Sequence, residues 1–397
     1  MALSTSEAVP VAADATPARG RNWRNLRAPI VFVCVFAWFN SIVDSHAARM
    51  RAEQVRDRMA DASLDDPNEV PRRDRSCGES VEEYWKYIPD ARSHRLALLV
   101  GMSQQHSIYE RKQGQRLTSE LMDDELAREG VRVFGLAAPN LNNEEALLYM
   151  LATGADPRTR PHAFIYGVCF DKMRNIDLRP RLQTFLHGRP ELLEIWRETA
   201  ARYAKRYPTA TSKMLQTLEQ ISQPEVVATA EDTVERRLRN RLASVLPVVE
   251  HREALNGWIQ QKLYELRNLV LNIKTSSKRP IMAARYDLNR EFLGIIADEA
   301  KAKQIDLLPY VIPLNPLSEN PYVPAEYAAF KSWFAEFGSE HDLFWKNLES
   351  LVPSEEWGVM FGEPDFKHFR YAGHVRTARE LSAVFRERLV PNAASAK

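Results

Sequence analysis

Apolar segments of strand length alternate with helical patterns along this chain, and this alternation constrains the fold more than any other feature. The segments are 95–100, 131–136, 163–168 and 307–312. Strands that are apolar throughout and alternate with helices are typical of a parallel sheet that helices cover on both faces. We therefore predict a three-layer α/β/α domain that extends over about 80–391, with a short polar tail at 392–397.

Helical periodicity fills the segments between the predicted strands. Between the first two strands, Leu117 and Leu126 precede Gly130, and glycine commonly ends a helix. Between the next two, the run EEALLYML ends near Gly154. The segment 180–278 is longer, charged and helical in pattern, and we interpret it as a helical insertion. Such an insertion could cap an active site, dock a partner or be a plain solvated excursion.

A basic segment followed by an uncharged, apolar one occupies the N-terminus. An apolar helix of about 20 residues spans a bilayer, so the uncharged stretch is short, although flanking residues can extend its reach. We predict a disordered basic N-terminus at 1–27, a transmembrane signal-anchor at 28–43 and a stalk or linker at 44–79. A cleaved signal peptide and a buried soluble helix are the alternatives.

The arginines before the predicted anchor favour a cytoplasmic N-terminus. The anchor would then cross the inner membrane of a bacterial cell once, and the main domain would be periplasmic or otherwise extracytoplasmic. Cys77 and Cys169 would lie in an oxidising compartment. They could form a disulfide or remain two unrelated thiols, with Cys169 buried beside a strand.

Charge and spacing argue against several classes of partner. Lys plus Arg (54) nearly balance Asp plus Glu (53), and the two signs interleave, so no basic stripe indicates nucleic-acid binding. The sequence has no Cys and His spacing typical of zinc sites and no glycine-rich phosphate loop. We therefore expect no metal, no cofactor and no nucleic-acid partner.

Three residue types that cooperate in nucleophilic catalysis occur near the ends of predicted elements. Ser103 directly follows the first apolar segment, and Asp365 and His368 form a D-x-x-H sequence that we expect in a loop before the last helix, at 375–388. A nucleophilic serine needs a histidine to accept its proton and a carboxylate to orient that histidine. Since a serine after a strand is also an ordinary helix cap, the hypothesis requires that the three meet in space.

Two further histidines lie beside these candidates in the sequence. His106 falls in the first turn of the helix expected after Ser103, and His374 begins the last helix. We expect surface or packing roles for both.

The order of these blocks resembles the SGNH/GDSL hydrolase superfamily. There, a Gly-Asp-Ser or Gly-Asn-Ser turn follows the first strand, and a D-x-x-H block precedes a glycine and the last helix. Here Gly101-Met102-Ser103 and Asp365-Phe366-Lys367-His368 match those blocks in order. The resemblance implies a flavodoxin-like parallel sheet. It also implies that Ser103 is the nucleophile, His368 the general base and Asp365 the residue that orients it.

More narrowly, VFGLAAPNLNNEEALLYML and FIYGVCFDKMR, together with the predicted anchor, are similar to the membrane-anchored relatives DltD and the AlgX/AlgJ group. The resemblance covers about 95–171 and 305–388. It implies a serine acyl-esterase or O-acyltransferase that acts on acylated cell-surface polysaccharide or a related carbohydrate beside a membrane-bound O-acyltransferase. The alternative is a catalytically degenerate binding or assembly factor for such an enzyme.

The blocks that form the oxyanion hole depart from the superfamily's pattern. Asn140 stands where the second block has glycine, and we expect the backbone N–H groups of Ser103 and Asn140 to form the hole because asparagine tolerates positive φ. Cys169 and Asp171 lie where the third block would supply an asparagine side chain. We expect Gln104 and Asp171 to contact substrate, with Gln104 as a replacement donor.

Overall fold

The computed structural model describes residues 77–390 apart from 79, 92–93, 110–111, 113, 223–277 and 361–362. All described residues belong to one of two compact units of the chain, composed of 57–227 and 266–397. The predicted N-terminus, anchor and tail, and most of the predicted stalk, lie outside the described residues. Within the described part of the chain, no helix has the length and apolar character needed to cross a membrane.

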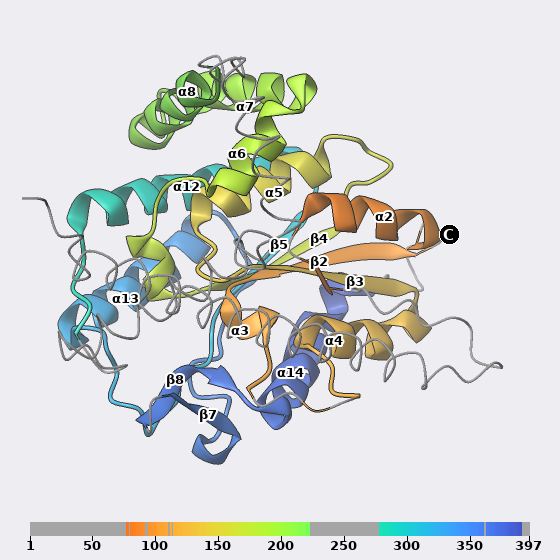
Figure 1. Ribbon diagram of the computed structural model, residues 1–397, viewed down its shortest axis with the longest axis vertical. Coiled ribbons are helices and arrows are strands. Elements are labelled where there is room, and N and C mark those ends of the chain that lie inside the picture. Colours follow the sequence, from red (N-terminus) through yellow and green to blue (C-terminus); the bar gives the residue numbers. More distant parts are fainter. Residues whose placement is uncertain are drawn as a thin grey trace, which may run out of the picture. The chain divides into compact units, whose positions relative to one another are not determined.

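A six-stranded parallel sheet forms the centre of the described unit (Figure 1). Its strands are β1 (Cys77–Gly78), β2 (Arg95–Gly101), β3 (Val131–Ala137), β4 (Ala163–Val168), β5 (Asp306–Val311) and β6 (Lys346–Asn347). They lie in the order β1-β3-β2-β4-β5-β6, and all neighbours are parallel. Without β1, this is the 2-1-3-4-5 order of flavodoxin-like sheets. The predicted α/β class with a flavodoxin-like parallel sheet is therefore confirmed, whereas the membrane helix that we predicted with it lies outside the described residues.

All of the predicted strands occur, and their ends differ from the predicted ones by at most one residue. They were detectable because nearly every residue in them is buried on both faces of the sheet. The short strands β1 and β6 were not predicted, since two-residue strands carry no periodicity. Because β1 pairs with β3, the segment that we predicted as linker contributes its last residues to the sheet.

Helices cover both faces of the sheet, in two separate apolar clusters. The larger cluster contains residues of α2 (Val81–Ala91), α5 (Asn143–Gly154), α12 (Ala283–Ala302) and α13 (Pro324–Glu340). The smaller cluster contains residues of α4 (Thr118–Leu126) and α14 (Tyr371–Leu389), which pack against each other (Figure 1). Between β2 and β3, α4 continues into a short 3-10 turn at Ala127–Glu129, and this helical stretch ends, as predicted, at Gly130, which has a left-handed φ of 77°.

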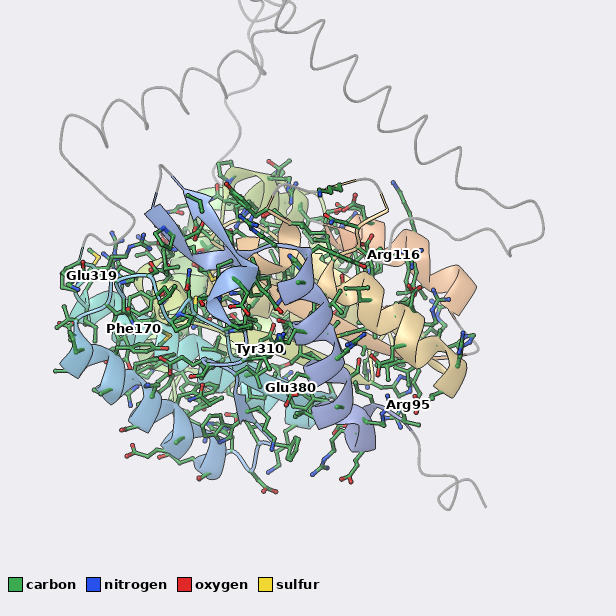
Figure 2. The ribbon with its side chains drawn as sticks, turned by 90° about the horizontal axis from the view of Figure 1, so that it is seen from below. Arg95, Arg116, Phe170, Tyr310, Glu319 and Glu380 are labelled. Carbon is green, nitrogen blue, oxygen red and sulfur yellow. The ribbon has the colours of Figure 1, made fainter. Side chains whose placement is uncertain are left out.

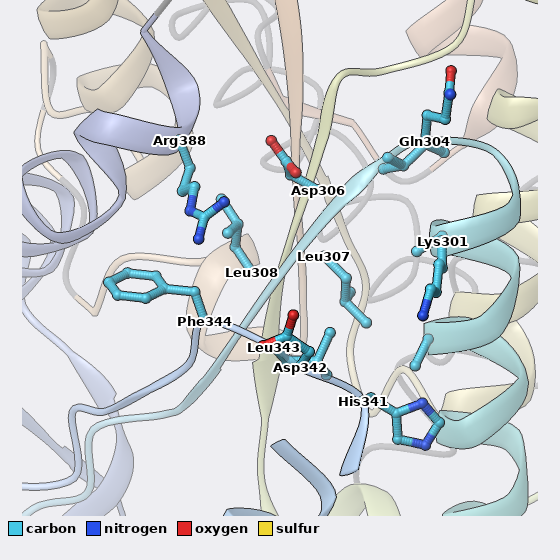
Figure 3. A pocket seen from close by; sticks show the side chains of 13 residues that line it. Lys301, Gln304, Asp306, Leu307, Leu308, His341, Asp342, Leu343, Phe344 and Arg388 are labelled. Carbon is cyan, nitrogen blue, oxygen red and sulfur yellow. The ribbon is translucent and has the colours of Figure 1, made fainter. Parts of the chain in front are cut away.

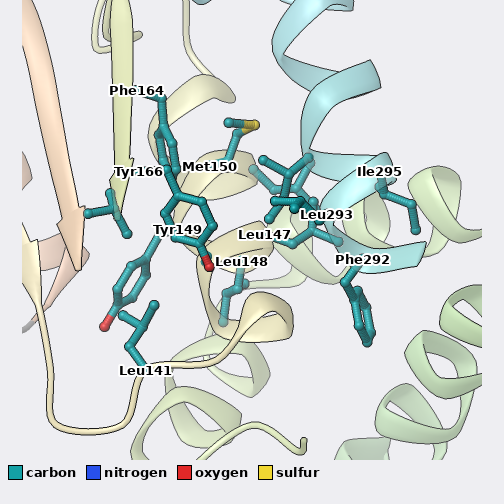
Figure 4. Close-up of a cluster of buried hydrophobic side chains, with 14 of the residues drawn as sticks. Leu141, Leu147, Leu148, Tyr149, Met150, Phe164, Tyr166, Phe292, Leu293 and Ile295 are labelled. Carbon is teal, nitrogen blue, oxygen red and sulfur yellow. The ribbon is translucent and has the colours of Figure 1, made fainter. Parts of the chain in front are cut away.

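Every residue of α5 is buried, which explains why the run EEALLYML shows little amphipathic character. Figure 4 shows Leu147 and Tyr149 of α5 among Phe164 of β4 and Phe292 of α12. Asn142 caps the start of the helix, because its side chain accepts a hydrogen bond from the backbone N–H of Glu145. Burial on all sides therefore fixes the start of α5 beyond the carboxyl end of β3, the strand that precedes it.

The described part of the predicted insertion forms three helices that pack outside α5 and α12 (Figure 1). They are α6 (Pro180–His187), α7 (Pro190–Tyr203) and α8 (Pro208–Ser222). Each begins with proline, which suits the first turn because its missing N–H would have no helical partner there. The rest of the insertion, 223–277, lies outside the described residues.

A small antiparallel hairpin separates β6 from the last helix. It consists of β7 (Trp357–Met360) and β8 (Glu363–Phe369), and β8 contains the D-x-x-H sequence. Our prediction of a loop at this position was wrong. The sequence EPDFKHF is rich in residues that are uncommon in strands, and pairing with β7 imposes the extended conformation. Short helical turns complete the fold: α3 (Ser103–His106), η1 (Ala127–Glu129), η2 (Phe170–Arg174) and η3 (Ser354–Glu356).

Candidate active site

The candidate site lies at the carboxyl ends of the central strands. The strand order reverses at β2, which has β3 on one side and β4 on the other. Open parallel sheets bind ligands in the crevice beside such a reversal. Ser103 is the first residue of α3, directly after β2, and η2 begins directly after β4. The sheet topology thus places the serine at the position where a crevice is expected.

Ser103, His368 and Asp365 form a continuous chain of hydrogen bonds. Nε2 of His368 lies 2.8 Å from Oγ of Ser103, although the two residues are 265 positions apart. Nδ1 of the same ring lies 2.7 Å from Oδ2 of Asp365. With the proton on Nδ1, the ring donates to the carboxylate, and Nε2 is left to accept the serine proton. This is the arrangement of a serine nucleophile with its base and orienting acid.

Asp365 is ionised and immobilised in this arrangement. Its Oδ1 accepts hydrogen bonds from the backbone N–H groups of Lys367, at 2.9 Å, and His368, at 3.2 Å. Burial alone would raise the pKa of Asp365, but the His368 ring and these N–H groups outweigh burial and hold the pKa below its usual value. A carboxylate fixed in this way keeps the imidazole in one tautomer and one orientation. The His368 side chain is 18% exposed, so the ring remains accessible from the solvent side.

The turn expected for the oxyanion hole has the predicted backbone conformation. Asn140 has a φ of 54°, in the left-handed region that glycine usually occupies. The turn lies beside the nucleophile, because Gly101 of β2 pairs with Ala137 of β3 and the N–H of Ala138 donates to the carbonyl of Gly101 at 3.3 Å. Asn140 therefore follows the end of the strand next to the one that carries Ser103.

Cys169 does not replace the missing third-block asparagine as a donor. It is a free, buried thiol that contacts Sδ of Met102, and burial raises its pKa. Of the two alternatives for the cysteines, the disulfide between Cys77 and Cys169 is therefore wrong.

Asp171 has a different environment from the substrate-facing one that we expected. It is buried at the start of η2, where Nη1 of Arg279 lies 2.9 Å and Nζ of Lys367 3.1 Å from its Oδ2. Burial would raise the pKa of Asp171, but Lys367 and Arg279 outweigh it and lower the pKa. A carboxylate neutralised by two cations does not oppose an oxyanion as a free one would.

Gln104 uses its side-chain amide within the protein. Its side chain is buried, and Nε2 donates to the carbonyls of Pro313, at 2.9 Å, and Lys367, at 3.0 Å. Both N–H bonds of the amide are therefore used within the protein, and none is left for an oxyanion. The prediction missed this because both acceptors lie more than two hundred positions further along the chain, at separations of 209 and 263.

The other histidines have the structural placement that we expected, as far as they are described. His374 is fully buried on α14, where Nδ1 lies 2.9 Å from Oγ1 of Thr118 and Nε2 lies 3.2 Å from the carbonyl of Ser107. It thus joins α14 to α4 and to the segment after α3. His106 ends α3, and its side chain lies outside the described part of the structure.

Sequence reasoning missed Lys367, Arg279 and Asn315. Asn315, in the segment after β5, donates from Nδ2 to the carbonyl of Asp365 at 2.8 Å, and its backbone N–H donates to the carbonyl of Phe366 at 3.0 Å. The only signal in the sequence was the position of Lys367 inside the D-x-x-H block. Phe170, the residue before Asp171, is labelled in Figure 2; it is fully buried, and its ring centroid lies 4.8 Å from that of Tyr322.

A cavity of about 340 Å³ lies at the other end of the sheet (Figure 3). Its walls include Lys301, Asp306, His341, Phe344 and Arg388. Asp306 is the first residue of β5, whereas the candidate site is at the carboxyl ends of the strands. The cavity is therefore separate from Ser103. Among the described residues, no group of three or more His, Cys, Asp or Glu side chains could hold a metal ion.

Comparisons with known proteins add little beyond this geometry. No protein-family model matches the chain, and no curated protein matches it in sequence. Among solved structures, the chain is similar to a Bacteroides fragilis protein provisionally described as an acylhydrolase, with a TM-score of 0.34 and 7% identity, covering 78% of this chain and 98% of that one. A similarity of this size carries no argument about the site.

Proposed function

We propose that this protein is a serine acyl-esterase or O-acyltransferase. The observation that supports this proposal is the hydrogen-bonded chain from Ser103 through His368 to Asp365, with distances of 2.8 and 2.7 Å. Three residue types that nucleophilic catalysis requires meet at the end of the sheet where α/β proteins bind ligands.

In the proposed reaction, Oγ of Ser103 attacks the carbonyl carbon of an ester while its proton passes to Nε2 of His368. The charge of Asp365 stabilises the imidazolium that forms. The tetrahedral intermediate carries a negative oxygen, which the backbone N–H groups of Ser103 and Asn140 would stabilise. When the bond to the leaving oxygen breaks, His368 returns the proton to that oxygen, and the acyl group remains on Ser103.

The second half of the reaction decides between hydrolysis and transfer. A water molecule or a carbohydrate hydroxyl attacks the acyl-enzyme, His368 accepts its proton, and Ser103 leaves with that proton restored. Hydrolysis and transfer share every earlier step, so the acceptor alone separates the two activities. With one oxyanion donor fewer than the superfamily's pattern, the rate would be about a hundredfold to a thousandfold lower than that of a complete site.

We also propose the finer assignments that the sequence motifs suggest. These are an acylated cell-surface polysaccharide or related carbohydrate as substrate, an N-terminal membrane anchor, an extracytoplasmic catalytic domain and a membrane-bound O-acyltransferase as partner. The support for them is the basic and apolar N-terminus and the resemblance of the sequence blocks.

A fluorophosphonate probe tests the proposal, because it reacts covalently with an activated serine. We expect an adduct on Ser103, located by mass spectrometry, in the wild-type protein. Ser103→Ala should abolish labelling, and His368→Ala should reduce it by several orders of magnitude, because the proton acceptor is lost. Ser339→Ala and His187→Ala serve as controls, since Ser339 and His187 are exposed and lie on other helices.

If folded wild-type protein is not labelled, the nucleophile is inactive and the proposal fails. That result would favour the assembly factor. One observation is consistent with that alternative: Cys169, in the third block, contacts Met102 within the protein.

A further inference from the structure

The hairpin that carries His368 and Asp365 is not part of the central sheet. β7 and β8 form a separate two-stranded sheet. An isolated two-stranded hairpin is marginally stable in water. The position of His368 over Ser103 therefore depends on the contacts that hold this hairpin against the α/β domain.

Several of these contacts bind the backbone of β8 at successive residues. Asn315 donates to the carbonyls of Asp365, at 2.8 Å, and Phe366, at 3.0 Å. Gln104 donates to the carbonyl of Lys367 at 3.0 Å. Gln104 directly follows the candidate nucleophile, so one buried side chain connects the serine's turn to the strand that carries the histidine.

A buried ion pair adds a side-chain contact at the same point. Nζ of Lys367 lies 3.1 Å from Oδ2 of Asp171, and these side chains are only 10% and 7% exposed. Arg279 also contacts Asp171. Buried ion pairs contribute little net stability, and some determine a specific arrangement instead. Since successive side chains in a strand point to opposite sides, a Lys367 side chain held in the domain determines where its neighbour His368 points.

We propose that Gln104, Asp171, Asn315 and Lys367 form a polar clasp that positions His368 and Asp365 over Ser103. This inference rests on the proposed function. The clasp residues do not contact the reacting atoms; they act through the histidine and its carboxylate. The clasp also explains why a carboxylate can occupy the third block, because both oxygens of Asp171 are engaged by cations of the protein.

The test compares rates of fluorophosphonate labelling for the full-length protein. Lys367→Met removes the ammonium group but keeps the length of the side chain. We expect a rate about a hundredfold below wild type, since misplacing a catalytic group by about 1 Å costs that much. Lys367→Arg keeps the charge and should recover most of the rate. Lys331→Met is the control for loss of a lysine ion pair, because Lys331 of α13 pairs with Glu349 at 2.8 Å, in a more exposed position and without a hydrogen bond to β8 among the described residues.

Measuring the rate at several probe concentrations separates positioning from general stability. Loss of positioning lowers the maximal labelling rate and leaves both the probe's apparent affinity and the final labelled fraction unchanged. A purely structural defect lowers the labelled fraction instead. Asp171→Asn should slow labelling in the same way. The double variant with Lys367→Met should be no slower than the slower single variant, because the ammonium group of Lys367 acts through its pair with Asp171.

Gln104→Met provides an independent test, also in case Lys367→Met does not fold. It removes the two donated hydrogen bonds without leaving a buried charge, and it should slow labelling with the labelled fraction unchanged. The inference is overturned if Lys367→Met or Gln104→Met, once folded, reacts at the wild-type rate. It is also overturned if Lys367→Arg is as slow as Lys367→Met. Absence of labelling in the wild-type protein would instead refute the proposed function.

Discussion

Lys172 allows a quantitative prediction about the stability of this protein. The residue lies in η2 and is fully buried, with Nζ 3.8 Å from the centre of the Tyr166 ring. Within the described residues, Nζ has no hydrogen-bond partner. Burial lowers the pKa of Lys172 from 10.5 to about 7, because the charged form loses its hydration.

The lowered pKa makes stability depend on pH with a definite sign. Between pH 7 and 10.5 the unfolded chain keeps the proton that the folded protein releases, so this group makes the folded state more stable as pH rises. At about 1.4 kcal/mol per pH unit, the full effect is about 5 kcal/mol. We expect the buried amine of Lys172 to lower the free energy of unfolding by about 4 kcal/mol at pH 7 and by about 1.5 kcal/mol at pH 9.5.

Lys172→Met removes the titrating group while keeping an unbranched side chain that packs well against an aromatic ring. The variant should be more stable than wild type at pH 7, and this advantage should shrink by about 3 kcal/mol at pH 9.5. Urea unfolding followed by tryptophan fluorescence at both pH values measures the difference. Lys205→Met, at an exposed position, is the control and should follow the wild-type pH dependence.

An advantage of equal size at both pH values would refute the reasoning. The amine would then keep its ordinary pKa in the folded protein, which requires hydration that the burial of Lys172 does not allow.

Two further predictions concern other buried positions. Burial raises the pKa of Glu144 from 4.5 to about 7, so its contribution to stability is complete below pH 4.5 and is lost as pH rises to about 7. Between pH 4.5 and 7.5, the unfolding free energy of Glu144→Gln should therefore fall by about 3 kcal/mol less than that of the wild-type protein. Urea unfolding at both pH values measures this, and an equal fall in the two proteins would contradict the prediction. At Gly373, a Cβ would overlap Cβ of Phe369, the last residue of β8. Gly373→Ala should lower the unfolding free energy by about 1–3 kcal/mol and slow fluorophosphonate labelling. The control Ala372→Gly, on the same turn of α14, should preserve the labelling rate. Equal labelling rates for the two variants would show that the overlap does not displace β8.

The local sequence was sufficient to predict the central strands and the main features of the turns after them. Each predicted strand is buried on both faces, so its residues are apolar throughout, and this signal is independent of distant partners. Asn140 was expected to tolerate positive φ, and its φ is 54°. The residue types of the triad were also visible, because the chemistry of a nucleophile requires particular side chains.

The tertiary structure alone decided how these residues meet. β8 forms because β7 pairs with it, and the sequence of β8 has no alternating pattern that predicts a strand. Gln104 and Asp171 have the residue types of substrate contacts, yet the structure uses them to hold the histidine's strand. Lys367 and Asp171 are 196 positions apart in the sequence. Local periodicity reports which face of an element is buried, but which polar groups meet there depends on the packing of the whole chain.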